Sequence, residues 1–164
     1  MKEKRINKIK KGPICSVKKY LFDRESGFFR EMSAFGNFII LSFLILIFFG
    51  WTKDFLKVYF YFLLIELFSC LIKLIFYRDR PKKEKHSNII EKISASSFPS
   101  SHSARSIFVF FVLFNNLSGF FKISLLFVPI GVGFSRVLIK KHYISDVLAG
   151  YVLGTIFFLS FILF

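Results

Sequence analysis

The sequence predicts an all-α fold, a polytopic membrane bundle of about five transmembrane helices. Hydrophobic residues make up 54% of the 164 positions, phenylalanine fills 26 of them, and the mean hydropathy is +0.58. Apolar runs close to the length of a bilayer crossing recur along the chain, whose length favours a single domain. We therefore expect a basic cytoplasmic or interfacial segment at 1–34 and a transmembrane domain at 35–164.

Five apolar segments separated by polar connections predict the crossing helices. The first segment is slightly short for a crossing, and we expect its flanks to complete it. The other four are each about 20 residues long and largely apolar, which is the length that a helix needs to span the hydrocarbon layer. The expected spans are 35–51, 58–77, 99–117, 119–139 and 144–164.

Particular residues set the ends and the packing of these helices. Pro81 should stop the second helix, because proline lacks a backbone N–H and disfavours helix before it. Ser100 or Ser101 is well suited to cap the start of the third helix. Gly150 and Gly154 lie four residues apart on the fifth helix, where they allow a neighbouring helix to approach closely.

The distribution of lysine and arginine predicts the orientation of the chain. Basic residues concentrate in 1–34, 78–105 and 136–141, whereas the connections at 52–57 and 115–122 hold few. Because cytoplasmic segments are enriched in positive charge, we expect the N-terminus to be cytoplasmic. With five crossings, the segments 78–105 and 136–141 then also face the cytoplasm.

The formal net charge of +14 also bears on the partners of the chain. The basic residues lie between apolar spans, so anionic lipid headgroups or phosphate are the expected partners. There is no recognition-helix pattern and no zinc-finger spacing, and we expect no nucleic acid. The two cysteines, Cys15 and Cys70, provide no disulfide framework and leave the redox compartment open. We read no signal peptide, and the oligomeric state cannot be derived from the sequence.

Three polar clusters stand out against the apolar background: "KLIFYRDRP" at 73–81, "FPSSHSA" at 98–104 and "SRVLIKKHYISD" at 135–146. They lie at the end of the second helix, at the start of the third, and across the connection between the fourth and fifth. In a bundle with five crossings, these places share one face of the membrane. The convergence indicates a functional site.

The first two clusters carry groups that suit a phosphoryl ligand. Lys73 and Arg80 are seven residues apart and would project from one face of a continuous helix, and Arg136 could join them. Ser100, Ser101 and their backbone N–H groups stand at a helix start, which attracts anions. Each feature also has a structural interpretation: the basic residues are common at membrane interfaces, and the serines form an ordinary capping segment.

The third cluster suggests a nucleophile. His142 and Asp146 are four residues apart, so they share a helix face, and an aspartate that accepts the proton-bearing nitrogen leaves the other nitrogen free to attack. A His–Asp pair at an interface can also be purely structural. His102 is a second imidazole that could act as acid or base. Glu66, in mid-span, could pair with a catalytic cation, be protonated or have a purely structural partner, and we leave it outside the site.

Together the clusters resemble the type 2 phosphatidic acid phosphatase (PAP2) superfamily, which includes membrane lipid phosphatases and vanadium-dependent haloperoxidases. The family pattern is K-x6-R-P, then P-S-G-H, then S-R-x5-H-x3-D, and the resemblance covers the chain from about residue 35 to its end. The chain departs from the pattern where Ser101 replaces the glycine of the second motif, which matters if the backbone there needs a positive φ. The matching residues are Lys73, Arg80, Pro81, Pro99, Ser100, His102, Ser135, Arg136, His142 and Asp146.

The resemblance implies a metal-independent phosphatase without a cofactor. In it His142 attacks phosphorus to form a phosphohistidine, Asp146 orients His142, and His102 protonates the leaving oxygen and then activates water. The phosphate would be bound by the remaining site residues: Lys73, Arg80, Ser100, Ser101 and Arg136.

The short form and the "SFPSSHSARS" segment at 97–106 are similar to the branch that acts on polyisoprenoid diphosphates. Phosphatidate and phosphatidylglycerol phosphate are close alternatives as the lipid phosphate substrate. A vanadate-dependent haloperoxidase is disfavoured, because those relatives are soluble and larger. The non-enzymatic alternative is a catalytically silent lipid-phosphate-binding membrane protein.

Overall fold

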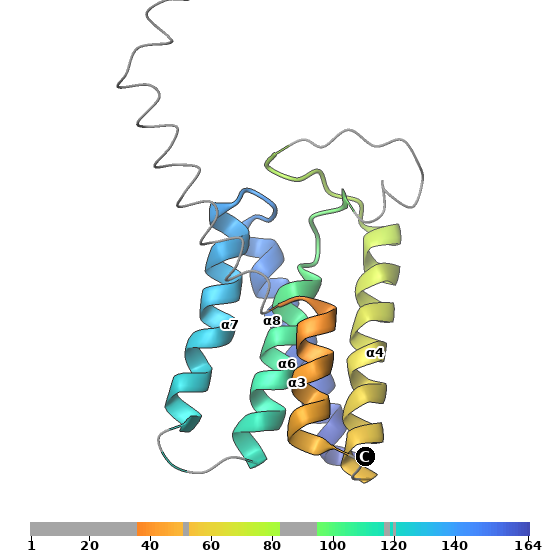
Figure 1. Ribbon diagram of the computed structural model, residues 1–164. Coiled ribbons are helices and arrows are strands. Elements are labelled where there is room, and N and C mark those ends of the chain that lie inside the picture. The colour runs from red at the N-terminus through yellow and green to blue at the C-terminus, as the bar shows by residue number, and fades with distance from the viewer. Residues whose placement is uncertain (1–35, 51–52, 83–94, 117–118, 120) are drawn as a thin grey trace, which may run out of the picture.

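The computed structural model describes residues 36–50, 53–82, 95–116, 119 and 121–164, and over these ranges it is all-helical. The expected segment at 1–34 lies outside the described residues. Figure 1 shows helices that run up and down the bundle in turn. In chain order the helices are α3 (Phe38–Phe49), α4 (Lys53–Ile75), α6 (Ser101–Asn116), α7 (Phe121–Leu138) and α8 (Ile144–Leu163).

These helices confirm the predicted fold class, and the largest differences from the expected bounds that bear on the site are at the two ends of α4. α4 begins at Lys53 rather than at 58, and Asp54 in its first turn suits the positive end of the helix dipole. It ends at Ile75, before Tyr77, and the chain around Pro81 is irregular. Arg80 therefore does not continue the helical face of Lys73, as the seven-residue spacing suggested, but lies in the connection that follows α4.

α6 is the central helix of the bundle and packs against each of the other four. Its contact with α8 depends on the two glycines of that helix. A Cβ built on Gly150 would lie 2.5 Å from the carbonyl oxygen of Ser100, and one on Gly154 would lie 2.2 Å from that of Ala104. These distances confirm the predicted close approach, because no side chain fits between the two backbones.

The apolar core is formed by buried side chains of α3, α4, α6 and α8. It contains fully buried side chains from α4 and α6, including Phe62, Ile65 and Phe108. Outward-facing apolar side chains cover the helix surfaces, for example Ile47, which is 77% exposed. Two described helices, α4 over Asp54–Ile75 and α8, are long and apolar enough to cross a membrane. An apolar exterior of this kind fits a protein that is surrounded by lipid.

Candidate active site

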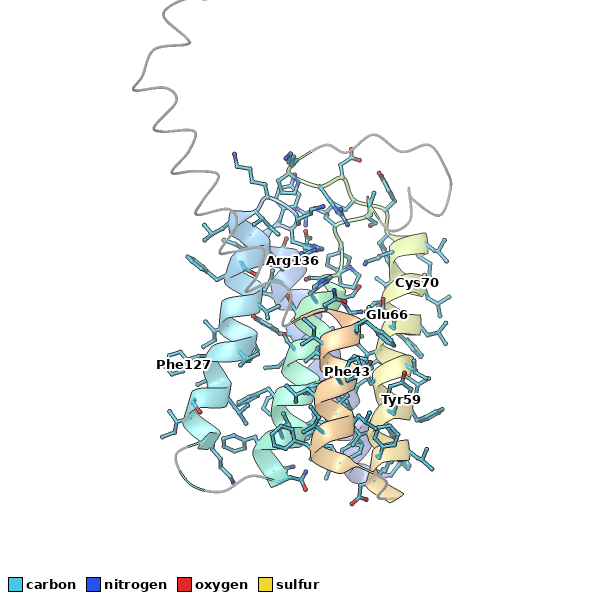
Figure 2. The ribbon with its side chains drawn as sticks, in the orientation of Figure 1. Phe43, Tyr59, Glu66, Cys70, Phe127 and Arg136 are labelled. Atoms are coloured by element: carbon cyan, nitrogen blue, oxygen red, sulfur yellow. The ribbon has the colours of Figure 1, made fainter. Side chains whose placement is uncertain are left out.

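The structure brings the three polar clusters to one end of the bundle. This end holds the last turn of α4, the first turn of α6 and the connection between α7 and α8 (Figure 1). Lys73 lies in the last turn of α4, His102 in the first turn of α6, and Arg136 in the last turn of α7. Figure 2 shows Arg136 at this end, above Phe127 on the same helix. The expected convergence of the motifs is therefore present.

The C-terminus of α7 turns the chain so that His142 returns to Arg136. Lys140 has a φ of 58°, a left-handed conformation. Its N–H donates to the carbonyl oxygen of Val137 at 3.0 Å, and the N–H of Lys141 donates to that of Arg136 at 3.1 Å. This pair of bonds is a Schellman cap. The N–H of His142 also reaches the Arg136 carbonyl oxygen, at 3.2 Å, so the imidazole follows the cation directly.

His142 is buried, and the backbone determines which of its nitrogens carries the proton. Its Nδ1 lies 2.6 Å from the carbonyl oxygen of Ser97, which can only accept a hydrogen bond. Nδ1 is therefore protonated, and the lone pair of the neutral ring lies on Nε2. The expected partner, Asp146, has its Oδ2 at 4.0 Å from Nδ1. Nδ1 of His142 thus donates to the Ser97 carbonyl oxygen and not, as we predicted, to the Asp146 carboxylate.

The carboxylate of Asp146 is fully buried and accepts hydrogen bonds from two groups other than His142. Its Oδ1 accepts from Nη1 of Arg78 at 2.8 Å, and its Oδ2 accepts from the N–H of Tyr143 at 2.8 Å. The second bond caps the first turn of α8, where a carboxylate also suits the helix dipole. Arg78 in addition lies over the ring of Tyr143, 4.2 Å from its centroid. Sequence reasoning missed Arg78, because "RDRP" contains two arginines and only Arg80 matches the family spacing.

The start of α6 is capped as predicted. Ser100 Oγ accepts from the backbone N–H of Ser103 at 3.4 Å and from its hydroxyl at 2.9 Å. The N–H of Ser100 donates to the carbonyl oxygen of Asp146 at 3.0 Å and so ties the start of α6 to the start of α8. That backbone donor is used within the fold, and the hydroxyl of Ser100 is what it can offer to a ligand.

Ser101 replaces the family glycine without backbone strain. Among the described residues other than glycine, a positive φ is found at Lys140, so Ser101 has an ordinary φ. Its side chain adds a contact that glycine cannot make, because Nζ of Lys73 donates to its Oγ at 2.8 Å. The ends of α4 and α6 are thereby connected at the site.

Burial and the nearby cationic side chains together lower the pKa of His142. Burial and the Arg136 guanidinium, followed by Lys73 and Arg80, lower the pKa of His142 to about 3, against the opposing effect of its bond to Ser97. The ring is therefore neutral at physiological pH, with its Nε2 lone pair available. His102 lies within the same electrostatic environment, close to Arg136, Lys73 and His142.

His102 has a partner that the sequence did not indicate. Nη2 of Arg105 lies 3.4 Å from Nδ1 of His102 and also donates to the carbonyl oxygen of Gly36 at 3.1 Å. Nη1 of Arg105 is paired with the carboxylate of Glu66. Glu66, labelled in Figure 2 on α4, is therefore the partner of a buried cation, one of the roles that its mid-span position left open.

Residues 54–164, more than half of the chain, match the sequence profile of the PAP2 superfamily. The chain belongs to this superfamily. The match confirms the family that the three motifs predicted and the expectation of a PAP2-type phosphatase. No curated protein sequence matches the chain at a significant level. Within the described ranges, no group of three or more His, Cys, Asp and Glu side chains is arranged to hold a metal ion.

Two solved structures share the fold of this PAP2 protein. The transmembrane PAP2-type phosphatidylglycerolphosphate phosphatase of Bacillus subtilis is 21% identical, with a TM-score of 0.66 over 93% of this chain and 87% of that one. LpxE of Aquifex aeolicus is also 21% identical, with a TM-score of 0.70 over 85% of this chain and 86% of that one. The similarity shows that this chain has the fold of these two proteins, and such a helical bundle agrees with its apolar exterior.

Proposed function

We propose that this PAP2 protein is an integral-membrane lipid phosphatase that acts through a phosphohistidine on His142. The observation that carries the proposal is the state of His142. Its Nδ1 proton is held by the Ser97 carbonyl at 2.6 Å, and its Nε2 lone pair is left for attack among the cations Lys73, Arg80 and Arg136. A buried nucleophile beside several positive charges suits a substrate that is itself an anion.

The proposed reaction begins when His142 Nε2 attacks the terminal phosphorus. Arg136 and Arg80 bind the phosphoryl oxygens and stabilise the charge of the transition state, aided by Lys73 and by the hydroxyls of the two serines at the start of α6. His102 faces the leaving oxygen. Asp146 supports His142 indirectly, because it holds the first turn of α8 and the Arg78 side chain in place. Water then releases phosphate from the phosphohistidine.

We propose a polyisoprenoid diphosphate as the favoured substrate. The support is the basic site at the end of an apolar bundle, where a lipid chain can stay in the bilayer while its phosphate reaches the site, together with the "SFPSSHSARS" segment. Phosphatidate and phosphatidylglycerol phosphate stay as close alternatives, and one structural neighbour is a phosphatidylglycerolphosphate phosphatase.

Phosphate release from purified protein in detergent tests the proposal. The substrates are farnesyl and longer isoprenyl diphosphates, phosphatidate and phosphatidylglycerol phosphate, each assayed with and without a chelator. We expect turnover that the chelator leaves unchanged and that His142→Ala abolishes. Equal and negligible release by the native protein and by His142→Ala on every substrate would favour the silent lipid-phosphate binder. Activity lost on chelation would contradict the metal-independent mechanism.

The proposed orientation places the N-terminus and the site on the cytoplasmic side. Lys82 is exposed at the site end of the bundle, so it is a suitable position for a labelling cysteine. In a protein in which Cys15 and Cys70 are replaced by serine, Lys82→Cys should react with a membrane-impermeant maleimide only after the cells are opened. Labelling in intact cells would reverse the orientation.

A further inference from the structure

Arg105 is a buried arginine that lies about one helical turn after His102 on α6. Its side chain is 5% exposed, and its contacts come from three parts of the fold: Glu66 on α4, the Gly36 carbonyl before α3, and Nδ1 of His102 on its own helix. A charge buried this deeply is stable only when it is paired and hydrogen-bonded. The pair with Glu66 meets that need and holds the guanidinium in one place.

The contact with His102 determines the protonation of the ring. A guanidinium nitrogen can donate a hydrogen bond but cannot accept one. At 3.4 Å from Nη2 of Arg105, Nδ1 of His102 is therefore the acceptor, and the proton of the neutral ring lies on Nε2. This is the opposite tautomer to that of His142, whose Nδ1 is the donor.

Nδ1 of His102 cannot keep its contact with Arg105 and also take up a second proton. The other charged or titratable groups near the ring are Arg136, Lys73 and His142, and the Glu66 carboxylate pairs with the guanidinium of Arg105. A second proton would create an imidazolium beside a fixed cation, and it would also remove the lone pair that accepts from Arg105. The neutral ring with a protonated Nε2 is therefore the form that this arrangement stabilises.

We propose that Arg105, held by Glu66, is a positioning residue that keeps His102 neutral with its proton on Nε2, and that it thereby selects substrates whose leaving group departs as a phosphate anion. The proposal rests on the phosphatase function above and deepens it. It also changes the expected role of His102, which donates a hydrogen bond to the leaving oxygen and does not transfer its proton.

With a diphosphate substrate, the proposed reaction needs no proton from His102. His142 Nε2 forms a bond to the terminal phosphorus, the bond to the bridging oxygen breaks, and the lipid monophosphate leaves as a dianion that accepts a hydrogen bond from His102 Nε2–H. Water then forms a bond to phosphorus, the P–N bond breaks, the electron pair returns to His142, and phosphate leaves with both protons of the water. A lipid monophosphate would instead have to expel an alkoxide, which requires a full proton.

Nitrogen NMR of protein labelled with 15N-histidine tests the tautomer in the native protein and needs no turnover. Signals are assigned with His102→Asn and His142→Asn. We expect His102 to show a bare Nδ1 and a protonated Nε2, and His142 to show the reverse. In Arg105→Met, which removes the donor, the His102 signals should move to a mixture of tautomers. A protonated Nδ1 on His102 in the native protein would overturn the proposal.

The effect on substrate choice is measured with farnesyl diphosphate and farnesyl monophosphate, because the two share a chain and differ in leaving group. We expect native protein to favour the diphosphate. Arg105→Met should lower the ratio of kcat/KM for the diphosphate to kcat/KM for the monophosphate by roughly 10- to 100-fold. Without the Arg105 guanidinium, His102 takes up and delivers a proton more readily, which favours the monophosphate. The matched control is Lys122→Met, which removes a cation that lies 4.8 Å from the Phe114 ring centroid at the other end of the bundle. It should leave the ratio unchanged.

The outcomes separate the two proposals. If the native protein hydrolyses neither farnesyl substrate nor any other lipid phosphate, the proposed function fails, while the NMR measurement still decides the tautomer. If Arg105→Met lowers both kcat/KM values equally, the residue is merely structural and its selecting role is refuted. If that variant does not fold, Glu66→Gln takes its place, since it retains the guanidinium but loosens it, and a smaller shift of the ratio in the same direction is expected.

Discussion

Gly154→Ala is the sharpest test of the packing that holds the active site together. The added Cβ would lie 2.2 Å from the carbonyl oxygen of Ala104 and 2.5 Å from Cγ2 of Ile107. Ordinary contact begins at 3.4 Å, so α6 and α8 must separate locally by roughly 1 Å. The Ala104 oxygen belongs to a helix backbone and cannot rotate away as a side chain would.

The energetic cost follows from this displacement. Overpacking of a tight contact destabilises a protein by about 1–3 kcal/mol. Replacing glycine by alanine within a helix stabilises it by about 1 kcal/mol, because alanine has the higher helix propensity. We expect a net loss of up to about 2 kcal/mol in the free energy of unfolding. The separation also pulls on the bond between the Ser100 N–H and the Asp146 carbonyl, which joins the two helix starts at the site. A misplacement of about 1 Å there should lower kcat/KM by about 10- to 100-fold.

The assay combines thermal unfolding in one detergent with phosphate release under identical conditions. The control is Val152→Ile, which adds a methyl group to a side chain of α8 that is 60% exposed. This control should keep native stability and activity. A Gly154→Ala protein with the melting temperature and kcat/KM of the native protein would refute the close contact between α6 and α8.

Three further predictions concern the loops around the site. Lys140→Gly should raise the free energy of unfolding by about 1 kcal/mol, because glycine adopts a positive φ without strain; an unchanged or lower melting temperature would contradict this. The folded-state pKa of His142, about 3, lies below the value of about 6.5 for an unfolded histidine. The unfolded chain therefore binds more protons between these values, and stability is complete above pH 6.5 and falls as the pH drops toward 3. His142→Gln should flatten this fall in pH-dependent unfolding, and identical slopes would exclude His142 as its source. A double-mutant cycle with Arg78→Met and Asp146→Asn should yield a coupling of about 1 kcal/mol, since Arg78 is partly exposed; additive effects would show that the pair contributes nothing.

The helices and their arrangement could be predicted because they depend on local pattern and on a simple geometric constraint. Apolar runs of bilayer length define the spans, and alternate crossings then bring every second connection to the same end. Gly150 and Gly154 likewise indicated a close helix contact from their spacing alone. The end of α4 was less predictable: the break before Pro81 was expected, but the loss of helix by Tyr77 moved Arg80 off the face of Lys73.

Sequence pattern alone was thus sufficient to predict the fold class, the family and the end of the bundle where the polar motifs meet. Which groups pair there depends on the folded arrangement of the helices. Ser97 lies 45 residues from His142, Glu66 lies 39 from Arg105, and Arg78 lies 68 from Asp146. Such pairs depend on distances of a few ångströms between separate segments, and a hydrogen bond is lost over about 1 Å, so no spacing within one motif can specify them.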